Sequence, residues 1–246
     1  MTLAPEWAAA FMLAFARVGT LVMLLPGVSE RALPTRIRLA MALVLTLVFL
    51  PIAQPLLPRG SLIAALLMEI AIGFTLGFTA RLIVAALQTA GTVVAQDLGL
   101  SYAQTIDPTA GSQGTAIANL LTLLGATLVF VTDLHHLAIS AIGASYMKLP
   151  PGALPKAGDA LSLAMRTMAT GFALAVKIAA PFAVFAIVFN VGLGVLSRMM
   201  PSLQVFFIAL PASVLLGMLM LLAVIGVMMG VYLDALGDVL ALLNGR

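Results

Sequence analysis

The feature that most constrains the fold is a run of 35 residues, 199–233, that contains no charged side chain. Two further charge-free runs, 39–58 and 178–197, span 20 residues each, and a third, 108–132, spans 25. A helix of about 20 apolar residues crosses the hydrocarbon core of a bilayer. Hydrophobic residues make up 63% of the chain and charged residues 9%, whereas a soluble domain carries about 25% charged residues. The sequence therefore predicts an all-α integral membrane protein.

The apolar segments divide into about six helical units, which we expect to be long and either kinked or folded back as hairpins. Several are too long for one span, because 35 helical residues reach about 52 Å. Pro181 and Pro211 predict bends in the last two units, and Gly125 and Gly143 predict softer breaks in the fourth. The expected units are 6–26, 38–57, 61–95, 114–147, 162–197 and 202–233.

Several classes of function are excluded or disfavoured by composition and motifs. The chain has no cysteine, which excludes disulfides, thiolate metal sites and a cysteine nucleophile. No cluster of Lys and Arg accompanies the net charge of +3, so no nucleic-acid partner is expected. No catalytic motif and no phosphate-binding loop is present, so we expect no enzyme activity and no cofactor. Asp133, His135 and His136 adjoin one another, but adjacent helical side chains diverge by about 100°, which favours a helix connection over a metal site.

The long apolar units contain charged residues, among them Glu69, Arg81, Arg166 and Lys177. A charge at the bilayer centre costs about 2.5–3.5 kcal/mol unless it is paired or hydrated. We therefore expect much of this chain to pack against protein or to face water. Glu69 and Arg81 could also supply the charges of a substrate site, which leaves open a small-molecule transporter that acts alone.

Isolated polar residues in two other segments need partners. In the connection 27–38, Arg31, Arg36 and Arg38 predict either a topology-setting loop or a contact with another subunit, and both interpretations can hold. The segment 190–201 holds Asn190 and Arg198 and stops at Pro201, so it is either a plain helix end or a second subunit contact.

The segment 96–114 is the most polar stretch, yet it keeps several large apolar side chains. Asp107 and Pro108 start a turn, while the apolar members are Leu98, Leu100, Tyr102 and Ile106. Irregular backbone at membrane depth is tolerated only inside protein or beside water. The residues therefore leave two interpretations open, a solvent loop and a pore-lining element.

Two pairs of glycines four residues apart, Gly73 with Gly77 and Gly226 with Gly230, predict faces on which helices pack closely. Methionines gather in the last unit, where thioethers suit irregular core packing or a deformable seal.

Three motifs, in this order, closely resemble the FliR family of flagellar export proteins, whose injectisome counterparts form the SctT family. They are SERALPTRIRLAMALVLTL at 29–47, GLSYAQTIDP at 99–108 and NVGLGVLSRMMPSLQVFFIALP at 190–211. The resemblance runs through nearly the whole chain. It implies a single domain over 1–246, with a FliP-like part near 1–147 and a FliQ-like part near 148–246.

The resemblance also implies a function and partners. One copy of such a chain is expected to join FliP-like and FliQ-like subunits in an export gate of the inner membrane, within the flagellar basal body. FlhA-like and FlhB-like components and unfolded export substrates are the other expected partners. The central loop then becomes a plug of the closed pore, formed by Leu98, Leu100, Tyr102, Ile106, Asp107 and Pro108. The expected subunit contacts are Arg31, Arg36, Arg38, Asn190, Arg198 and Pro201.

Overall fold

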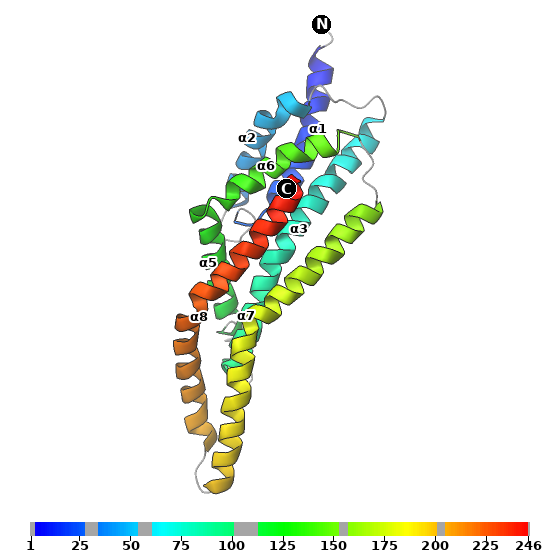
Figure 1. Ribbon diagram of the computed structural model, residues 1–246. Helices are drawn as coiled ribbons and strands as arrows, with labels where there is room; N and C mark the ends of the chain where they lie inside the picture. Colours follow the sequence, from blue (N-terminus) through cyan, green and yellow to red (C-terminus); the bar gives the residue numbers. More distant parts are fainter. Residues whose placement is uncertain are drawn as a thin grey trace. The chain divides into compact units, whose positions relative to one another are not determined.

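The computed structural model describes residues 3–27, 34–53, 61–100, 113–152, 157–200 and 205–245 (Figure 1). In these ranges the chain forms seven helices and no strand. The helices are α1 (Leu3–Leu24), α2 (Thr35–Ala53), α3 (Leu62–Asp97), α5 (Gln113–Val131), α6 (Leu134–Lys148), α7 (Ala157–Met199) and α8 (Val205–Asn244). The predicted all-α fold is confirmed.

Five of these helices are long and apolar enough to cross a membrane, and the bent pair α5–α6 adds a sixth candidate span. The two longest, α7 and α8, have 43 and 40 residues. At about 1.5 Å per residue they extend about 65 and 60 Å, roughly twice the thickness of the hydrocarbon core. The protein is thus a multi-pass membrane protein with helices longer than a bilayer requires.

The expected fourth unit, 114–147, is two helices rather than one. α5 ends at Val131 and α6 begins at Leu134, with a bend of 75° between them. Asp133 at the break has a φ of 59°, a left-handed conformation that aspartate tolerates better than most residues. The break therefore falls at Asp133, in the cluster that the sequence analysis interpreted as a helix connection.

The softer breaks predicted at Gly125 and Gly143 are wrong, because both glycines lie inside helices. A Cβ at Gly125 would lie 2.7 Å from Cδ2 of Leu87, and one at Gly143 would lie 3.3 Å from Cε1 of Phe49. These glycines allow close packing rather than bending. α7 and α8 contain Pro181 and Pro211 within the helix, and the bends expected at these two residues stay a prediction.

The chain forms two compact units made of interleaved segments. The first comprises Met1–Val84, Ala126–Thr170 and Asp234–Arg246, and the second comprises Ala85–Gly125 and Gly171–Leu233. This division by contacts is a different one from the FliP-like and FliQ-like parts near 1–147 and 148–246, which stay a prediction.

In the first unit α1 packs against α2, and α2 also contacts α6. Gly73 and Gly77 of α3 face α1 closely. A Cβ at Gly73 would lie 3.2 Å from Cα of Arg17, and one at Gly77 would lie 2.7 Å from Cβ of Leu24. The predicted packing face at Gly73 and Gly77 is confirmed.

In the second unit, residues 171–199 of α7 and 205–233 of α8 run antiparallel (Figure 1). A Cβ added at Gly226 or Gly230 would meet no atom of the described chain within 4 Å. Large apolar side chains there are more than half exposed, among them Val184, Ile187, Val188, Val191, Leu219 and Leu222. These helices thus present apolar faces that the described parts of the chain leave uncovered.

Candidate functional site

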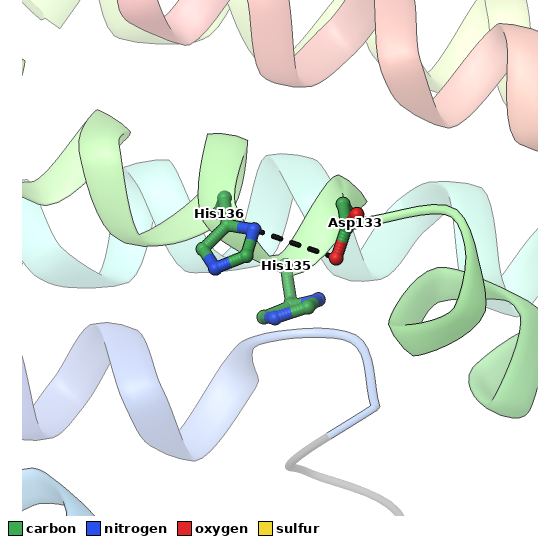
Figure 2. A group of neighbouring side chains, drawn as sticks. All are labelled: Asp133, His135 and His136. Carbon is green, nitrogen blue, oxygen red and sulfur yellow. Dashed lines mark ion pairs between the residues drawn. The ribbon is translucent and has the colours of Figure 1, made fainter.

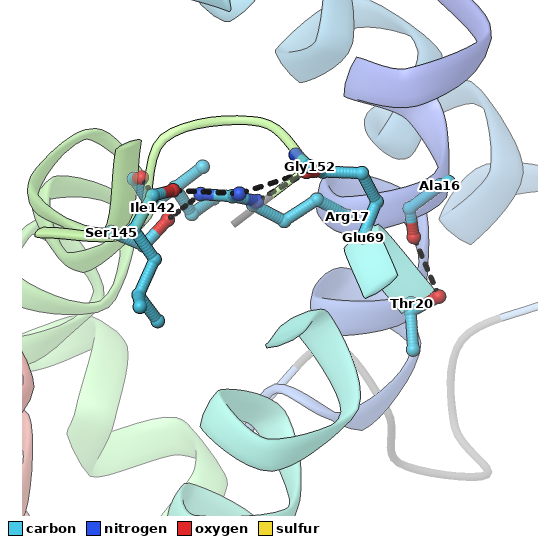
Figure 3. Close-up of polar contacts among 8 residues, drawn as sticks. Ala16, Arg17, Thr20, Glu69, Ile142, Ser145 and Gly152 are labelled. Carbon is cyan, nitrogen blue, oxygen red and sulfur yellow. Dashed lines mark hydrogen bonds and ion pairs between the residues drawn. The ribbon is translucent and has the colours of Figure 1, made fainter. Parts of the chain in front are cut away.

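A buried ion pair between Arg17 of α1 and Glu69 of α3 organises the first unit (Figure 3). Arg17 donates from Nε to Oε2 of Glu69 at 2.6 Å and from Nη2 to Oε1 at 3.0 Å. Both side chains have an exposed fraction of 0%. A two-pronged contact of this kind satisfies the planar geometry of both groups.

Arg17 and Glu69 also make hydrogen bonds to other residues. Arg17 Nη1 donates to Ser145 Oγ at 3.3 Å, and Nη2 donates to the carbonyl of Leu149 at 2.8 Å. The backbone N–H of Gly152 donates to Glu69 Oε1 at 3.1 Å, and the guanidinium lies 4.2 Å from the ring centroid of Tyr146. The network thereby connects α1, α3, α6 and the turn after α6.

This network changes the interpretation of the charges inside the apolar units. Glu69 and Arg81 lie 12 residues apart on one helix, a rise of about 18 Å, so they cannot pair within the chain. Glu69 pairs with Arg17 instead, and it has no exposed surface to offer a solute. Sequence reasoning missed Arg17 as the partner, although its position inside the first apolar segment was a usable signal.

The central segment starts from a tightly closed helix end. Gly99, with a φ of 81°, follows α3, and its N–H donates to the carbonyl of Gln96 at 2.9 Å. The N–H of Leu100 donates to the carbonyl of Ala95 at 3.1 Å. These two bonds and the left-handed glycine form a Schellman cap, which fixes the direction in which the chain leaves α3.

Leu98 anchors this exit to α8 inside the second unit. Its side chain is fully buried, and a Cβ at Gly217 would lie 3.0 Å from Leu98 Cγ, with a closer approach to Cδ2. Ser213 Oγ donates to the carbonyl of Leu98 at 3.3 Å. Leu100 is half-buried. Of the proposed plug residues, Leu98 is therefore placed as an anchor of the segment's base.

The other four proposed plug residues, Tyr102, Ile106, Asp107 and Pro108, lie outside the described residues. So do two proposed contact residues, Arg31 and Pro201.

The four described residues of the proposed subunit contacts divide between the two units. Arg36 is exposed, and Arg38 is half-buried with an Nε that has no hydrogen-bond partner in the described structure. In the second unit, Arg198 is exposed, and Asn190 donates to the carbonyl of Ala186 at 2.8 Å. Asn190 also lines a cavity of about 190 Å³ together with Asp97.

Comparison with known proteins gives consistent matches. The sequence pattern of the family described as "Bacterial export proteins, family 1" matches residues 8–239. The flagellar biosynthetic protein FliR of Caulobacter vibrioides is 42% identical over 214 residues, 85% of each chain. The FliR of Escherichia coli is 30% identical over 222 residues, 89% of this chain and 85% of that protein. The Yop proteins translocation protein T of Yersinia pestis is 28% identical over 155 residues, 62% of this chain and 59% of that protein.

Proposed function

Because the chain belongs to the family of bacterial export proteins, family 1, we propose that it is a subunit of an export gate in the inner membrane. It is a component of a flagellar or type III export apparatus. In the proposed gate, one copy joins FliP-like and FliQ-like subunits around a pore within the flagellar basal body. Unfolded flagellar proteins cross this pore with the help of FlhA-like and FlhB-like components. The chain contributes a conduit rather than an enzymatic reaction.

The observation that carries this proposal is the uncovered apolar surface on helices that exceed the bilayer thickness. α7 and α8 have 43 and 40 residues, and lipid tails cover only about 30 Å of such a helix. Val188 and Leu222 are 67% and 70% exposed. Apolar surface beyond the hydrocarbon core needs a protein cover, and neighbouring subunits of a gate supply one.

The central segment suits the proposed role of a plug. The Schellman cap and the Leu98 anchor hold the point at which the segment leaves α3, and the segment contains the large apolar residues Tyr102 and Ile106. In the proposal, these apolar side chains close the channel and Asp107–Pro108 sets the turn that returns the chain to α5.

The gate is tested by its composition. Co-expression with FliP-like and FliQ-like subunits, purification in detergent and native mass spectrometry should give a hetero-oligomer that contains one copy of this chain. A stable monomer or homo-oligomer, recovered without the other two subunits, would contradict the proposal and support a transporter that acts alone.

The plug is tested separately. Deletion of residues 101–111 should leave the recovered complex unchanged in mass but make membranes leak small ions. A complex that assembles and stays tight after the deletion would contradict the plug while leaving the gate intact. The flagellar assignment is favoured over an injectisome because the FliR of Caulobacter vibrioides, at 42% identity, exceeds the Yersinia pestis protein, at 28%.

A further inference from the structure

The corner between α5 and α6 brings three side chains with metal-binding atoms together (Figure 2). Asp133, His135 and His136 each offer one such atom, and these atoms lie within 4.8 Å of one another. His136 Nδ1 lies 3.6 Å from Asp133 Oδ1, which is longer than the usual hydrogen bond of about 2.9 Å. Two ligands of one tetrahedral Zn²⁺ ion are separated by about 3.3 Å, given bonds of about 2.0 Å. The distance between His136 Nδ1 and Asp133 Oδ1 is therefore close to that of two ligands on a shared ion.

The local backbone explains why Asp133 faces the histidines. Asp133 occupies the position before α6 in a left-handed conformation, and its side chain makes no capping hydrogen bond to that helix. Its carbonyl instead accepts a hydrogen bond from the N–H of His136 at 3.0 Å. The carboxylate is thus left available beside the first turn of α6.

The two imidazoles lie closer together than the expected divergence of adjacent helical side chains suggested. Their ring centroids are 4.1 Å apart, with an angle of 35° between the rings. Both residues lie in the first turn of α6, where no preceding turn of the same helix limits their rotamers. Adjacent positions in the sequence therefore present both rings to one small region.

The ring of His135 packs against an aromatic ring, while one of its nitrogens has no hydrogen-bond partner in the described structure. The ring of Phe130 lies 5.4 Å from that of His135, and His135 Nδ1 is buried without a hydrogen-bond partner in the described structure. In contrast, the side chains of His136 and Asp133 are 70% and 75% exposed. The cluster has a fixed member and two members that an ion can reach from solvent.

We propose that Asp133, His135 and His136 bind a divalent transition-metal ion of the Zn²⁺ type, with water in the open coordination position. Two imidazole nitrogens and one carboxylate oxygen match the ligands of such ions, whereas Mg²⁺ and Ca²⁺ prefer all-oxygen sites. All three ligands come from the break before α6 and its first turn. A bound ion therefore ties the left-handed residue to the helix that follows and stiffens the bend.

The site is tested with Zn²⁺ and the full chain in detergent, purified through a streptavidin-binding tag because a polyhistidine tag would itself bind the metal. Isothermal titration should show one Zn²⁺ per chain, and Co²⁺ should give visible absorption bands of a nitrogen–oxygen site. His136→Ala should weaken Zn²⁺ binding by about 100-fold or more, since even the loss of a supporting residue costs about 10- to 100-fold.

Two further variants separate ligation from backbone effects. Asp133→Gly removes the carboxylate but still permits a φ of 59°, and it should weaken binding as His136→Ala does. Glu6→Gln removes an exposed acid in the first turn of α1, in the same unit, and it should leave binding unchanged.

The outcomes that overturn the proposal are equally specific. One is a wild-type chain that binds no more Zn²⁺ than the double variant His135→Ala/His136→Ala, with both folded by circular dichroism. Another is an equal effect of Asp133→Gly and Glu6→Gln on affinity. If Zn²⁺ raises the Tm of the wild type but not that of the double variant, the site is supported.

Discussion

Two glycine pairs of the same spacing have opposite surroundings in this protein. At Gly73 and Gly77, an added Cβ would meet α1 within 3.2 Å. At Gly226 and Gly230, an added Cβ would meet no described atom within 4 Å. The comparison shows that the spacing defines a helix face suited to close contact, but it does not say whether the partner is in the same chain.

The two glycine pairs also differ in the charged residues near them. Gly73 lies next to Arg17, whose ion pair with Glu69 is fully buried. Gly226 and Gly230 lie in a run, 199–233, without any charged side chain. One face is fixed by directional polar bonds within the chain, and the other offers shape and apolar surface for a neighbour.

Breaking the ion pair should have the largest effect on the first face. Glu69→Ala leaves Arg17 buried without its partner, and loss of one member of a buried pair costs about 3–5 kcal/mol. The Tm of the purified chain should fall markedly, whereas Arg36→Ala at an exposed position should change stability by less than about 0.5 kcal/mol.

A double variant shows how the pair works. Arg17→Met/Glu69→Leu should recover most of the lost stability, because apolar replacement of both partners removes the unpaired charge. Equal Tm values for wild type and Glu69→Ala would mean that the network does not hold the first unit together.

Adding one methyl group should separate the two glycine pairs by the sign of the effect. Gly73→Ala forces a Cβ against the backbone of Arg17 and should cost about 1–3 kcal/mol. Gly226→Ala meets nothing and should stabilise the isolated chain by up to about 1 kcal/mol through helix propensity.

The same two substitutions should rank in the opposite order when assembly with partner subunits is measured instead of stability. Gly226→Ala should lower co-purification with the proposed FliP-like and FliQ-like subunits, because the methyl group enters the proposed contact. A variant that assembles as well as the wild type would show that this face meets lipid.

The anchor of the central segment gives a comparison within the second unit. Gly217→Ala should displace Leu98 and cost about 1–3 kcal/mol, since the side chain of Leu98 fills the space of a Cβ. Gly194→Ala, where nothing lies within 4 Å, is the matched control. Thermal unfolding of both variants measures the difference, and equal Tm values would contradict a fixed Leu98.

Charge reversal at the open surface should have the smallest effect on stability. Arg198→Glu and Arg36→Glu change exposed residues, so each should alter the stability of the chain by less than about 0.5 kcal/mol. Recovery of the FliP-like subunit should nevertheless fall if these arginines contact it. Full recovery would remove them from the proposed interface.

Much of the fold followed from residue patterns. Charge-free runs predicted apolar helices longer than a bilayer, and α7 and α8 have that length. The interpretation of Asp133 and the two histidines as a helix connection agrees with the break after α5. The breaks expected at Gly125 and Gly143 were wrong, because these glycines serve close packing inside helices. The plug and contact residues stay predictions, with Leu98 alone given a defined anchoring position.

The sequence by itself determined that this chain is a helical membrane protein, because charge-free runs of 20 to 35 residues are long enough to cross a bilayer as helices. Only the tertiary structure decided which polar groups meet. Arg17 and Glu69 are separated by 52 residues, and no local rule pairs them. Likewise, the open face of α8 and the packed face of α3 share one spacing, and only the placement of neighbouring helices distinguishes them. Spacing is a property of one helix, whereas contact is a property of two.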